Sequence, residues 1–209
     1  MRPSMFPPLA LIFGIVCSVD AANWPTWRGE NGAGVTSESE LPLKWSATEN
    51  VLWKVELAER SNSTSIVWGD RVMLTQAVGS KRLVFCFDRT TGKELWQAGT
   101  TWSKPEDSHP TNPYASASPA TDGESVVAWF GSAGLFAFDL EGKELWKADL
   151  GEHSHEWGYA AAPIIHGGLV ILNFGPGPRT FLVALDRKTG KEWPPRASII
   201  ASVAILQPL

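Results

Sequence analysis

Cysteine is scarce in this chain of 209 residues, which contains only Cys17 and Cys86. Cys17 lies in an N-terminal apolar segment that we expect to be removed, so Cys86 has no partner for an internal disulfide bond. Val84 and Cys86 alternate with Phe85 and Phe87, as side chains do along a β-strand. A reactive thiol favours nearby positive charge, so we interpret Cys86 as a small buried side chain.

Neither sign of charge dominates, because 18 Lys and Arg face 22 Asp and Glu, for a formal net charge of −4. This balance gives no electrostatic basis for binding nucleic acid or an anionic membrane. Long apolar runs are also missing: the run at residues 9–17 has nine residues, whereas a membrane helix needs about 20. Arg2 precedes this run, and small residues follow at 19 and 21. We therefore predict a signal peptide, no transmembrane span, and export to the periplasm or the cell exterior.

Tryptophan, in contrast, is abundant with eleven copies, and several of them belong to a repeated pattern. The pattern reads LVFCFDRTTGKELW at 83–96, LFAFDLEGKELW at 135–146 and FLVALDRKTGKEW at 181–193. In each copy an Asp closes an alternating apolar run, a Gly-Lys turn follows, and a Trp ends the copy. The equivalent residues are Asp88, Gly92 and Trp96; Asp139, Gly142 and Trp146; and Asp186, Gly190 and Trp193. Successive tryptophans are 50 and 47 positions apart, a period typical of β-propellers.

Turn signals inside each period divide it into four short strands, which together make one propeller blade. We place the blades at 61–97, 115–150 and 158–193. Residues 49–57 (ENVLWKVEL) resemble the end of a repeat, and we interpret them as an outer strand without a blade. The predicted fold class is therefore all-β: an incomplete β-propeller of four-stranded blades, with about three blades plus a lone N-terminal outer strand. Because one blade cannot bury both faces, each Trp should dock on small residues of the next blade, with Ala137 and Ala184 as candidates.

These assignments divide the chain into four parts. They are a signal peptide at 1–21, an N-terminal arm with the lone outer strand at 22–57, the blades at 58–196, and an atypical apolar tail at 197–209. We expect the arm to be ordered, because Trp24 and Trp27 are both costly to leave in water. The tail is either a displaced first strand of a fourth blade or non-native sequence after a frameshift or truncation, and we favour the second. An unclosed ring leaves strand edges through which copies can self-associate.

Three loops precede the inner strands of the blades and should converge at one rim of the propeller axis. They cover residues 61–64, 109–114 and 153–159. Loops on a rigid scaffold are where binding residues concentrate, so we expect a protein or a small ligand to bind at this rim. The candidate binding residues are His109, Asn112, Tyr114, His153, His155, Glu156, Trp157 and Tyr159.

Two chemical roles for these loop residues compete with a structural one. His153, His155 and Glu156 carry metal-ligating atoms, but a zinc site normally needs a further ligand. Glu156 and His109 would form an acid–base pair only if the fold placed them within reach of each other. We favour hydrogen bonding to neighbouring blades, and so predict no metal site and assign no catalytic residue. The repeated aspartates are interpreted as caps for the N–H groups of their own turns.

The repeats resemble the pyrroloquinoline-quinone-like (PQQ-like) family of β-propeller repeats, whose pattern is a strand, Ala-x-Asp-x-x-x-Gly-Lys-x-x-Trp, and a strand. The match covers roughly residues 23–193, and its closest copy is residues 184–193. The opening WPTWRG at 24–29, with LPLKW at 41–45, looks like the secreted members of this family common in planctomycete-type bacteria.

This resemblance implies two kinds of function. Quinoprotein dehydrogenases of the family bind the quinone and a calcium ion at the axis and oxidise alcohols or sugars, beneath an adjacent pair of cysteines. Outer-membrane assembly propellers, of the assembly factor B kind, bind no quinone and act as scaffolds. Cys86 stands alone, so we expect a noncatalytic binding or scaffold module without a cofactor. The alternative is a PQQ-dependent alcohol or sugar dehydrogenase, or a fragment of one, with quinone and calcium.

Overall fold

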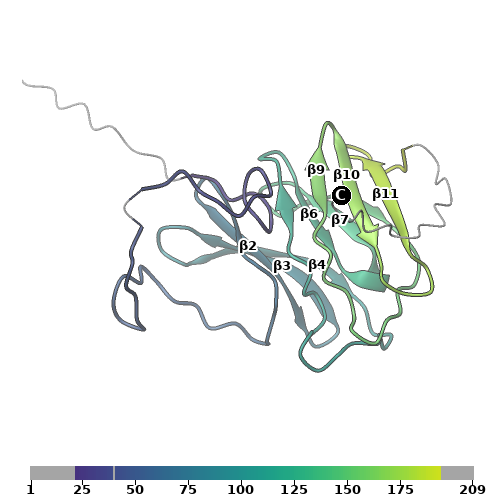
Figure 1. Cartoon of the computed structure of the whole chain (residues 1–209). Helices are drawn as coiled ribbons and strands as arrows, with labels where there is room; N and C mark the ends of the chain where they lie inside the picture. The colour runs from purple at the N-terminus through teal and green to yellow at the C-terminus, as the bar shows by residue number, and fades with distance from the viewer. Residues whose placement is uncertain (1–21, 40, 194–209) are drawn as a thin grey trace, which may run out of the picture.

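The computed structural model describes residues 22–39 and 41–193, and these form three antiparallel sheets that follow one another along the chain (Figure 1). The first sheet contains β1 (Ile66–Trp68), β2 (Arg71–Val78), β3 (Lys81–Asp88) and β4 (Glu94–Thr101). The second contains β5 (Ala120–Thr121), β6 (Val126–Trp129), β7 (Leu135–Phe138) and β8 (Glu144–Ala148), with a 3₁₀ turn, η1 (Gly131–Ala133), between β6 and β7. The third contains β9 (Ile164–His166), β10 (Leu169–Phe174) and β11 (Phe181–Asp186).

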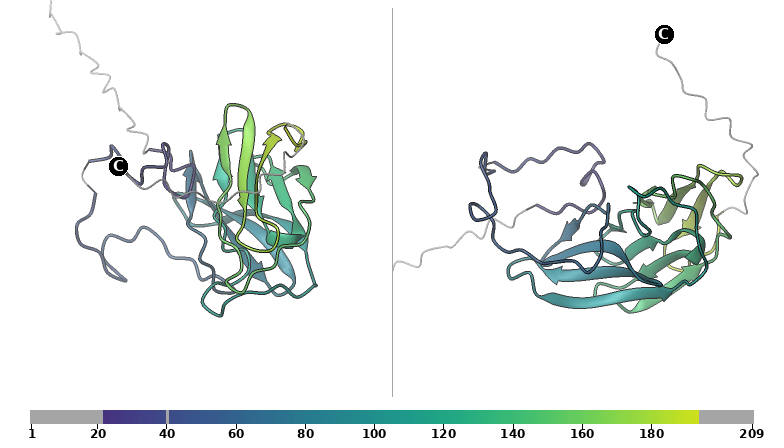
Figure 2. Two further views of the ribbon diagram at one scale, coloured as in Figure 1. Left: turned by 45° about the vertical axis from the view of Figure 1, so that its right-hand side comes forward. Right: turned by 90° about the horizontal axis from the view of Figure 1, so that it is seen from below.

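Each sheet is a meander, in which strands adjacent in sequence are hydrogen bonded to each other. This is the blade of a β-propeller, so the predicted all-β propeller class is confirmed. The blades lie one behind the other in chain order, as the further views in Figure 2 show. Contacts between inner strands run from β1 to β5 and from β5 to β9. The first and third blades lie at opposite ends of this row, and the described residues do not close a ring.

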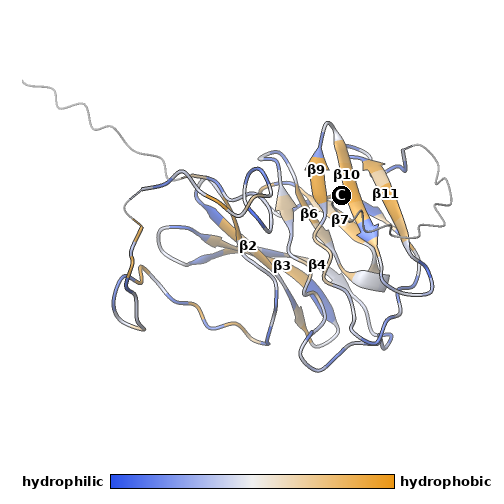
Figure 3. Cartoon of the chain, viewed as in Figure 1, coloured by the Kyte–Doolittle hydropathy of each residue, from blue (hydrophilic) through white to orange (hydrophobic). Residues whose placement is uncertain are grey.

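The apolar faces of successive blades meet in two buried clusters. We call the face of a blade toward the next blade its forward face, and the opposite face its backward face. In the first cluster, which joins the first two blades, the central residues are Met73, Val84, Cys86, Phe136 and Phe138. In the second, which joins the second and third blades, they are Val127, Leu135, Ala137, Val183 and Leu185. Figure 3 shows that apolar residues run along the strands that supply these faces.

The lone thiol lies inside the first of these clusters. Cys86 is fully buried on β3, as the alternating sequence around it predicts. Burial raises the pKa of the Cys86 thiol to about 12, so the sulfur stays protonated and is a poor nucleophile.

The outer strand of each blade is tied to the next blade by a tryptophan. The Trp96 indole Nε1–H donates to the carbonyl oxygen of Leu140 over 2.9 Å. Its ring lies so close to Gly142 that a Cβ there would sit 2.7 Å from it. Trp146 repeats both contacts with the third blade, at the Arg187 carbonyl (2.7 Å) and at Gly190.

These contacts correct part of the prediction from sequence. The tryptophans do dock on the next blade, but on the turn glycines rather than on Ala137 and Ala184. Ala137 instead pairs with Trp146 within their own sheet. A flat ring needs a surface without side chains, and only a glycine with positive φ offers one at the turn.

The aspartate of each repeat holds its own turn together. The Asp88 Oδ1 atom accepts hydrogen bonds from the Thr91 backbone N–H (2.7 Å) and hydroxyl (2.6 Å). Asp186 accepts the same pair from Thr189, and Asp139 accepts the backbone N–H of Lys143. The threonine hydroxyl bonds lower the pKa of the Asp88 and Asp186 carboxyls. The capping role predicted from sequence is therefore what these side chains perform.

The segment at 49–57 differs from its prediction. No strand forms there, because the described residues contain no third strand of a preceding blade for it to pair with. Trp53 nevertheless docks like the outer-strand tryptophans: its Nε1–H donates to the Arg89 carbonyl over 2.7 Å, and its ring covers Gly92. The segment thus keeps the tryptophan contact of an outer strand and lacks its sheet.

The end of the third blade also departs from the repeat. Glu192 bridges Leu185, as Glu144 pairs with Phe138 in the second blade. The third repeat is one residue shorter after its turn, so Leu145, which bulges out of register in the second blade, has no counterpart. The Trp193 N–H donates to the Ala184 carbonyl over 2.8 Å, at the place where Trp146 pairs with Ala137 in the second blade. Trp193 therefore keeps the place of Trp146 in the sheet, although its side chain is 64% exposed. The signal peptide at 1–21, the boundary at 196 and the apolar tail at 197–209 lie outside the described residues.

The N-terminal arm is bound along the inner edges of the first two blades. The backbone N–H and C=O of Trp24 both bond to Val67 over 2.8 Å, and the Pro25 carbonyl accepts the Thr121 N–H over 2.9 Å. The Trp24 ring packs on Gly29, so this part of the arm is ordered as expected. Trp27, in contrast, is 56% exposed, and the expectation that both rings leave water is wrong for it. In residues 22–39 and 41–193 there is no helix long and apolar enough to cross a membrane.

Replacing the turn glycine of the second blade should destabilise the protein strongly. Gly142→Ala adds a Cβ at positive φ (84°) and against the Trp96 ring, and should cost about 3 kcal/mol in the free energy of unfolding. Gly79→Ala is the matched control, because Gly79 also has positive φ but has open space around it; it should cost about 1 kcal/mol. Urea unfolding measures both. Equal losses would show that indole docking contributes nothing.

Candidate functional site

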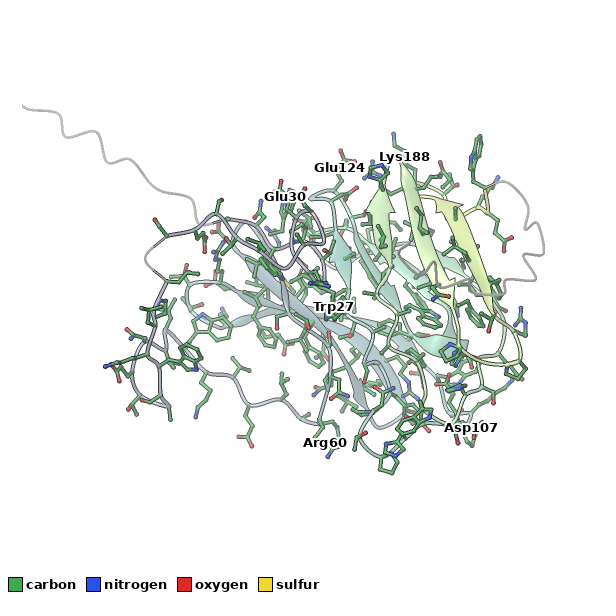
Figure 4. The ribbon with its side chains drawn as sticks, viewed as in Figure 1. Trp27, Glu30, Arg60, Asp107, Glu124 and Lys188 are labelled. Atoms are coloured by element: carbon green, nitrogen blue, oxygen red, sulfur yellow. The ribbon has the colours of Figure 1, made fainter. Side chains whose placement is uncertain are left out.

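The loops before the inner strands gather at one end of the blades. Figure 4 places Arg60 and Asp107 at this end, and Glu124 and Lys188 at the opposite end. The loops bond to each other in chain order: the Asn62 side-chain amide donates to the carbonyl of Thr111 over 2.8 Å. The Asn112 amide donates to the carbonyl of Trp157 over 2.6 Å. The predicted loop rim therefore forms, with Asn112 as its central link.

The outer layer of the rim is aromatic. The His109 ring stacks on the Trp157 ring with centroids 4.3 Å apart. Trp157 remains 54% exposed, and His109 Nδ1 is hydrogen bonded to the Thr111 hydroxyl at 2.8 Å. Beside this pair lies an open hollow of about 490 Å³, lined by Glu59, Arg60, Ala77, Gly79, Ser108, His109, Pro110, Pro113 and Tyr114.

Beneath the rim lies a buried ion pair that sequence reasoning missed. The side chains of Arg82 and Glu106 are 2% and 3% exposed, with 3.6 Å between guanidinium and carboxylate. Arg82 also stacks over the Tyr114 ring at 4.3 Å, and the Tyr114 hydroxyl donates to the Glu106 carbonyl. The sequence signal that could have found it is the alternation along β3, which places Arg82 on the same forward face as Val84 and Cys86. Nothing in the sequence places Glu106 next to it.

Tyr159 is a buried link between the second and third blades. Its hydroxyl oxygen accepts the Ala115 N–H over 3.1 Å, and its ring lies 4.9 Å from the ring of Trp129. Burial raises the pKa of the Tyr159 phenol, and the nearby Glu106 carboxylate raises it further. The phenol therefore stays neutral and serves as a fixed hydrogen-bonding group.

The two histidines of the last loop differ in burial. His153 is buried edge-on to Trp129 and Phe174, at 5.5 and 5.4 Å. His155 Nδ1 accepts the Trp157 N–H, and Glu156 is exposed. Among the described residues no three His, Cys, Asp or Glu side chains lie close enough to hold a metal ion. In the same part of the chain no hydrogen bond or ion pair joins Glu156 to His109.

Three repeated blades joined by tryptophans define a repeat β-propeller that displays a loop rim. A family model described as outer membrane protein assembly factor BamB matches residues 46–198. This match covers most of the chain, and the chain therefore belongs to that family of PQQ-like propeller repeats.

Two curated relatives are similar to the chain and are quinoproteins by name. One is the 1-butanol dehydrogenase (quinone) of Thauera butanivorans, 26% identical over 179 residues, which are 77% of this chain and 28% of that protein. The other is the quinoprotein alcohol dehydrogenase PedH of Pseudomonas putida, 28% identical over 156 residues, which are 70% of this chain and 26% of that protein. The chain thus spans about a quarter of the length of these relatives.

Solved structures of both kinds of relative align with the chain. A europium-containing methanol dehydrogenase aligns with a TM-score of 0.49 and 19% identity, over 64% of this chain and 24% of its own. BamB from Moraxella catarrhalis aligns with a TM-score of 0.45 and 20% identity, over 69% of this chain and 54% of its own. Alignments at this level do not distinguish a scaffold from an enzyme.

The buried histidine should make stability depend on pH. Burial lowers the pKa of His153 below its ordinary 6.5, so the unfolded chain takes up the proton first as pH falls. The contribution of His153 to the free energy of unfolding is therefore greatest above its unfolded-state pKa of about 6.5. It is lost as the pH falls from there toward the lower pKa of the folded state. His153→Phe should therefore reduce the loss of unfolding free energy between pH 7 and pH 5, measured by urea titration. An unchanged loss would contradict this assignment.

Proposed function

We propose that this protein is an exported, noncatalytic propeller module that binds polypeptide at its loop rim. The observation that carries the proposal is that polar side chains at the rim bond the loops to each other, whereas an aromatic pair there remains accessible. Polar groups such as the Asn62 and Asn112 amides hold the loops to each other. The stacked pair of His109 and Trp157 is left as a rigid, exposed aromatic surface beside the hollow.

Such a surface suits a protein ligand. Exposed tryptophans held in place lose little conformational entropy on binding and commonly dominate interface energies. Arg60, whose guanidinium donates to the Pro110 carbonyl, adds a positive charge at the same edge. The description of the matching family model as an outer membrane protein assembly factor supports a polypeptide ligand. Export through the signal peptide predicted at 1–21 belongs to the same proposal.

The rim should bind an unfolded outer-membrane β-barrel polypeptide, and Trp157 should supply much of the affinity. A fluorescently labelled barrel polypeptide, unfolded in urea and diluted into buffer, serves as ligand, and anisotropy reports binding. Trp157→Ala should weaken binding about tenfold, which is about 1.4 kcal/mol.

The matched control for this prediction is Trp27→Ala. Trp27 is as exposed as Trp157, at 56% against 54%, but lies on the N-terminal arm, away from Arg60 and Asp107 (Figure 4). Its replacement should leave the dissociation constant unchanged. Equal weakening by the two variants, or no saturable binding by the unaltered protein, would overturn the proposal.

A second candidate is favoured by the names of the two curated relatives: part of a quinone-dependent alcohol dehydrogenase. The described residues do not fit the quinone and its calcium ion. Cys86 is buried between blades, Trp24 and Pro25 occupy inner edges of the first two blades, and residues 22–39 and 41–193 contain no metal-binding cluster.

Thermal unfolding with and without PQQ and calcium separates the two candidates. A ligand raises the melting temperature only by binding the folded state, so a noncatalytic module should show no shift. Calcium alone is the control for a general salt effect. A rise that needs both quinone and calcium would favour the dehydrogenase over the binding module.

A further inference from the structure

A second hollow, of about 190 Å³, lies between the loop at 152–154 and the hairpin that joins β10 to β11. We call it the hairpin hollow. Ser154 lines it, and the Ser154 hydroxyl donates to the Asp107 carboxylate over 2.7 Å. The hollow therefore lies at the end of the blades where Figure 4 labels Asp107. Neither His109 nor Trp157 lines it, so it is distinct from the aromatic surface described above.

The wall of the hairpin hollow includes a polar side chain that is not fully bonded. His153 lines the hollow and is only 6% exposed. Its Nε2 atom is buried and has no hydrogen-bond partner within residues 22–39 and 41–193. Burial lowers the pKa of His153, and the Glu106 carboxylate and the Pro176 carbonyl oppose this shift only in part. Buried polar atoms are normally bonded, so this ring marks a wall that a ligand can complete.

A cation lines the same hollow. The Arg179 guanidinium lies over the Phe174 ring, 5.5 Å from its centroid, and Nη1 donates to the Glu152 carbonyl over a long 3.4 Å. This position requires a glycine at 151, because a Cβ on Gly151 would lie 2.0 Å from Nη1. The Glu152 carboxylate pairs with Lys104 at 3.2 Å. No carboxylate in the described part of the chain forms an ion pair with Arg179.

Phe174 brings the cation and the histidine together. Its ring is fully buried, with Arg179 over its face and the His153 ring edge-on at 5.4 Å. A guanidinium presents paired N–H donors that match the two oxygens of a carboxylate, and an imidazole N–H can add a further bond. A cavity of about 150 Å³ holds benzene, so the hairpin hollow has room for one ring or a short apolar chain.

We propose that the hairpin hollow binds a small carboxylate, whose oxygens bond to Arg179 and to Nε2 of His153 while its apolar group packs on Phe174. This site goes beyond the polypeptide-binding surface under Proposed function and uses other residues, so either proposal can fail alone. A free carboxylic acid and the last residue of a polypeptide carry the same chemistry. The test therefore compares these two sources.

Calorimetric titration of the purified chain with phenylacetate measures the binding, and phenylacetamide is the uncharged probe of the same shape. Phenylacetate should bind about tenfold more tightly than the amide, because a carboxylate forms charge-assisted hydrogen bonds. Equal affinity for the two probes, or no saturable binding of phenylacetate, would overturn the proposal.

Peptides that end in phenylalanine, with a free or an amidated C-terminus, distinguish the two sources. If the free-ended peptide also binds and the amidated one does not, the site accepts chain ends. If phenylacetate binds and neither peptide does, the ligand is a free acid.

Arg179→Gln should weaken phenylacetate binding about tenfold and remove the preference over the amide, with folding checked by circular dichroism. Arg28→Gln is the matched control. Arg28 also lies over an aromatic ring, that of Trp27 at 5.7 Å, and also donates to a backbone carbonyl over 3.4 Å, but on the N-terminal arm. It should bind phenylacetate like the unaltered chain. Equal weakening by both variants would show that the acid responds to charge in general, which would contradict the site.

The imidazole nitrogen resonances in a ¹⁵N spectrum locate the bound acid. Phenylacetate should shift the resonances of His153, because the carboxylate contacts Nε2. Those of His166 on β9, which does not line the hollow, should stay in place. Saturable binding that leaves the His153 resonances unchanged would place the acid elsewhere and refute this assignment.

Discussion

The contact between an indole ring and a glycine of the next blade is the constraint on which this structure depends. It occurs in the described blades at Trp53 on Gly92, Trp96 on Gly142 and Trp146 on Gly190. On the inner strand β1, the ring of Trp68 also lies against a glycine of the following blade, Gly123. The indole N–H groups of Trp53, Trp96 and Trp146 also donate to turn carbonyls. A ring fixed by its face and its N–H sets both the distance and the rotation between neighbouring blades.

The loop rim follows from that constraint. Once the blades are held at a fixed rotation, the loops before their inner strands emerge side by side. The Asn112 amide then reaches the Trp157 carbonyl across 45 positions of sequence. The buried pair of Arg82 and Glu106 supports the loops from below. A rim held together in this way is suited to presenting a surface.

The same constraint explains the unfinished ends. Because every blade buries its neighbour, a row of blades that does not close leaves one forward face and one backward face without a partner. Val55 and Trp53 cover part of the backward face, whereas Leu182 and Ile164 on the forward face stay in contact with solvent. Burial at the two ends is therefore incomplete among residues 22–39 and 41–193.

The sequence by itself determined the features that rest on neighbouring residues. The repeat period gave the blades, and the aspartate turns were predictable because Asp88 and Asp186 bond to groups three positions away. The burial of Cys86 followed from strand alternation. These interactions are local, so the order of residues is enough to specify them.

Only the tertiary structure decided which distant groups meet. It placed Trp96 on Gly142 rather than on an alanine, left Trp27 exposed, and paired Arg82 with Glu106. It also kept residues 49–57 out of a sheet, because a strand sequence forms a strand only where a partner edge exists. Such contacts depend on the stacking angle of whole blades, and no short pattern in the chain encodes that angle.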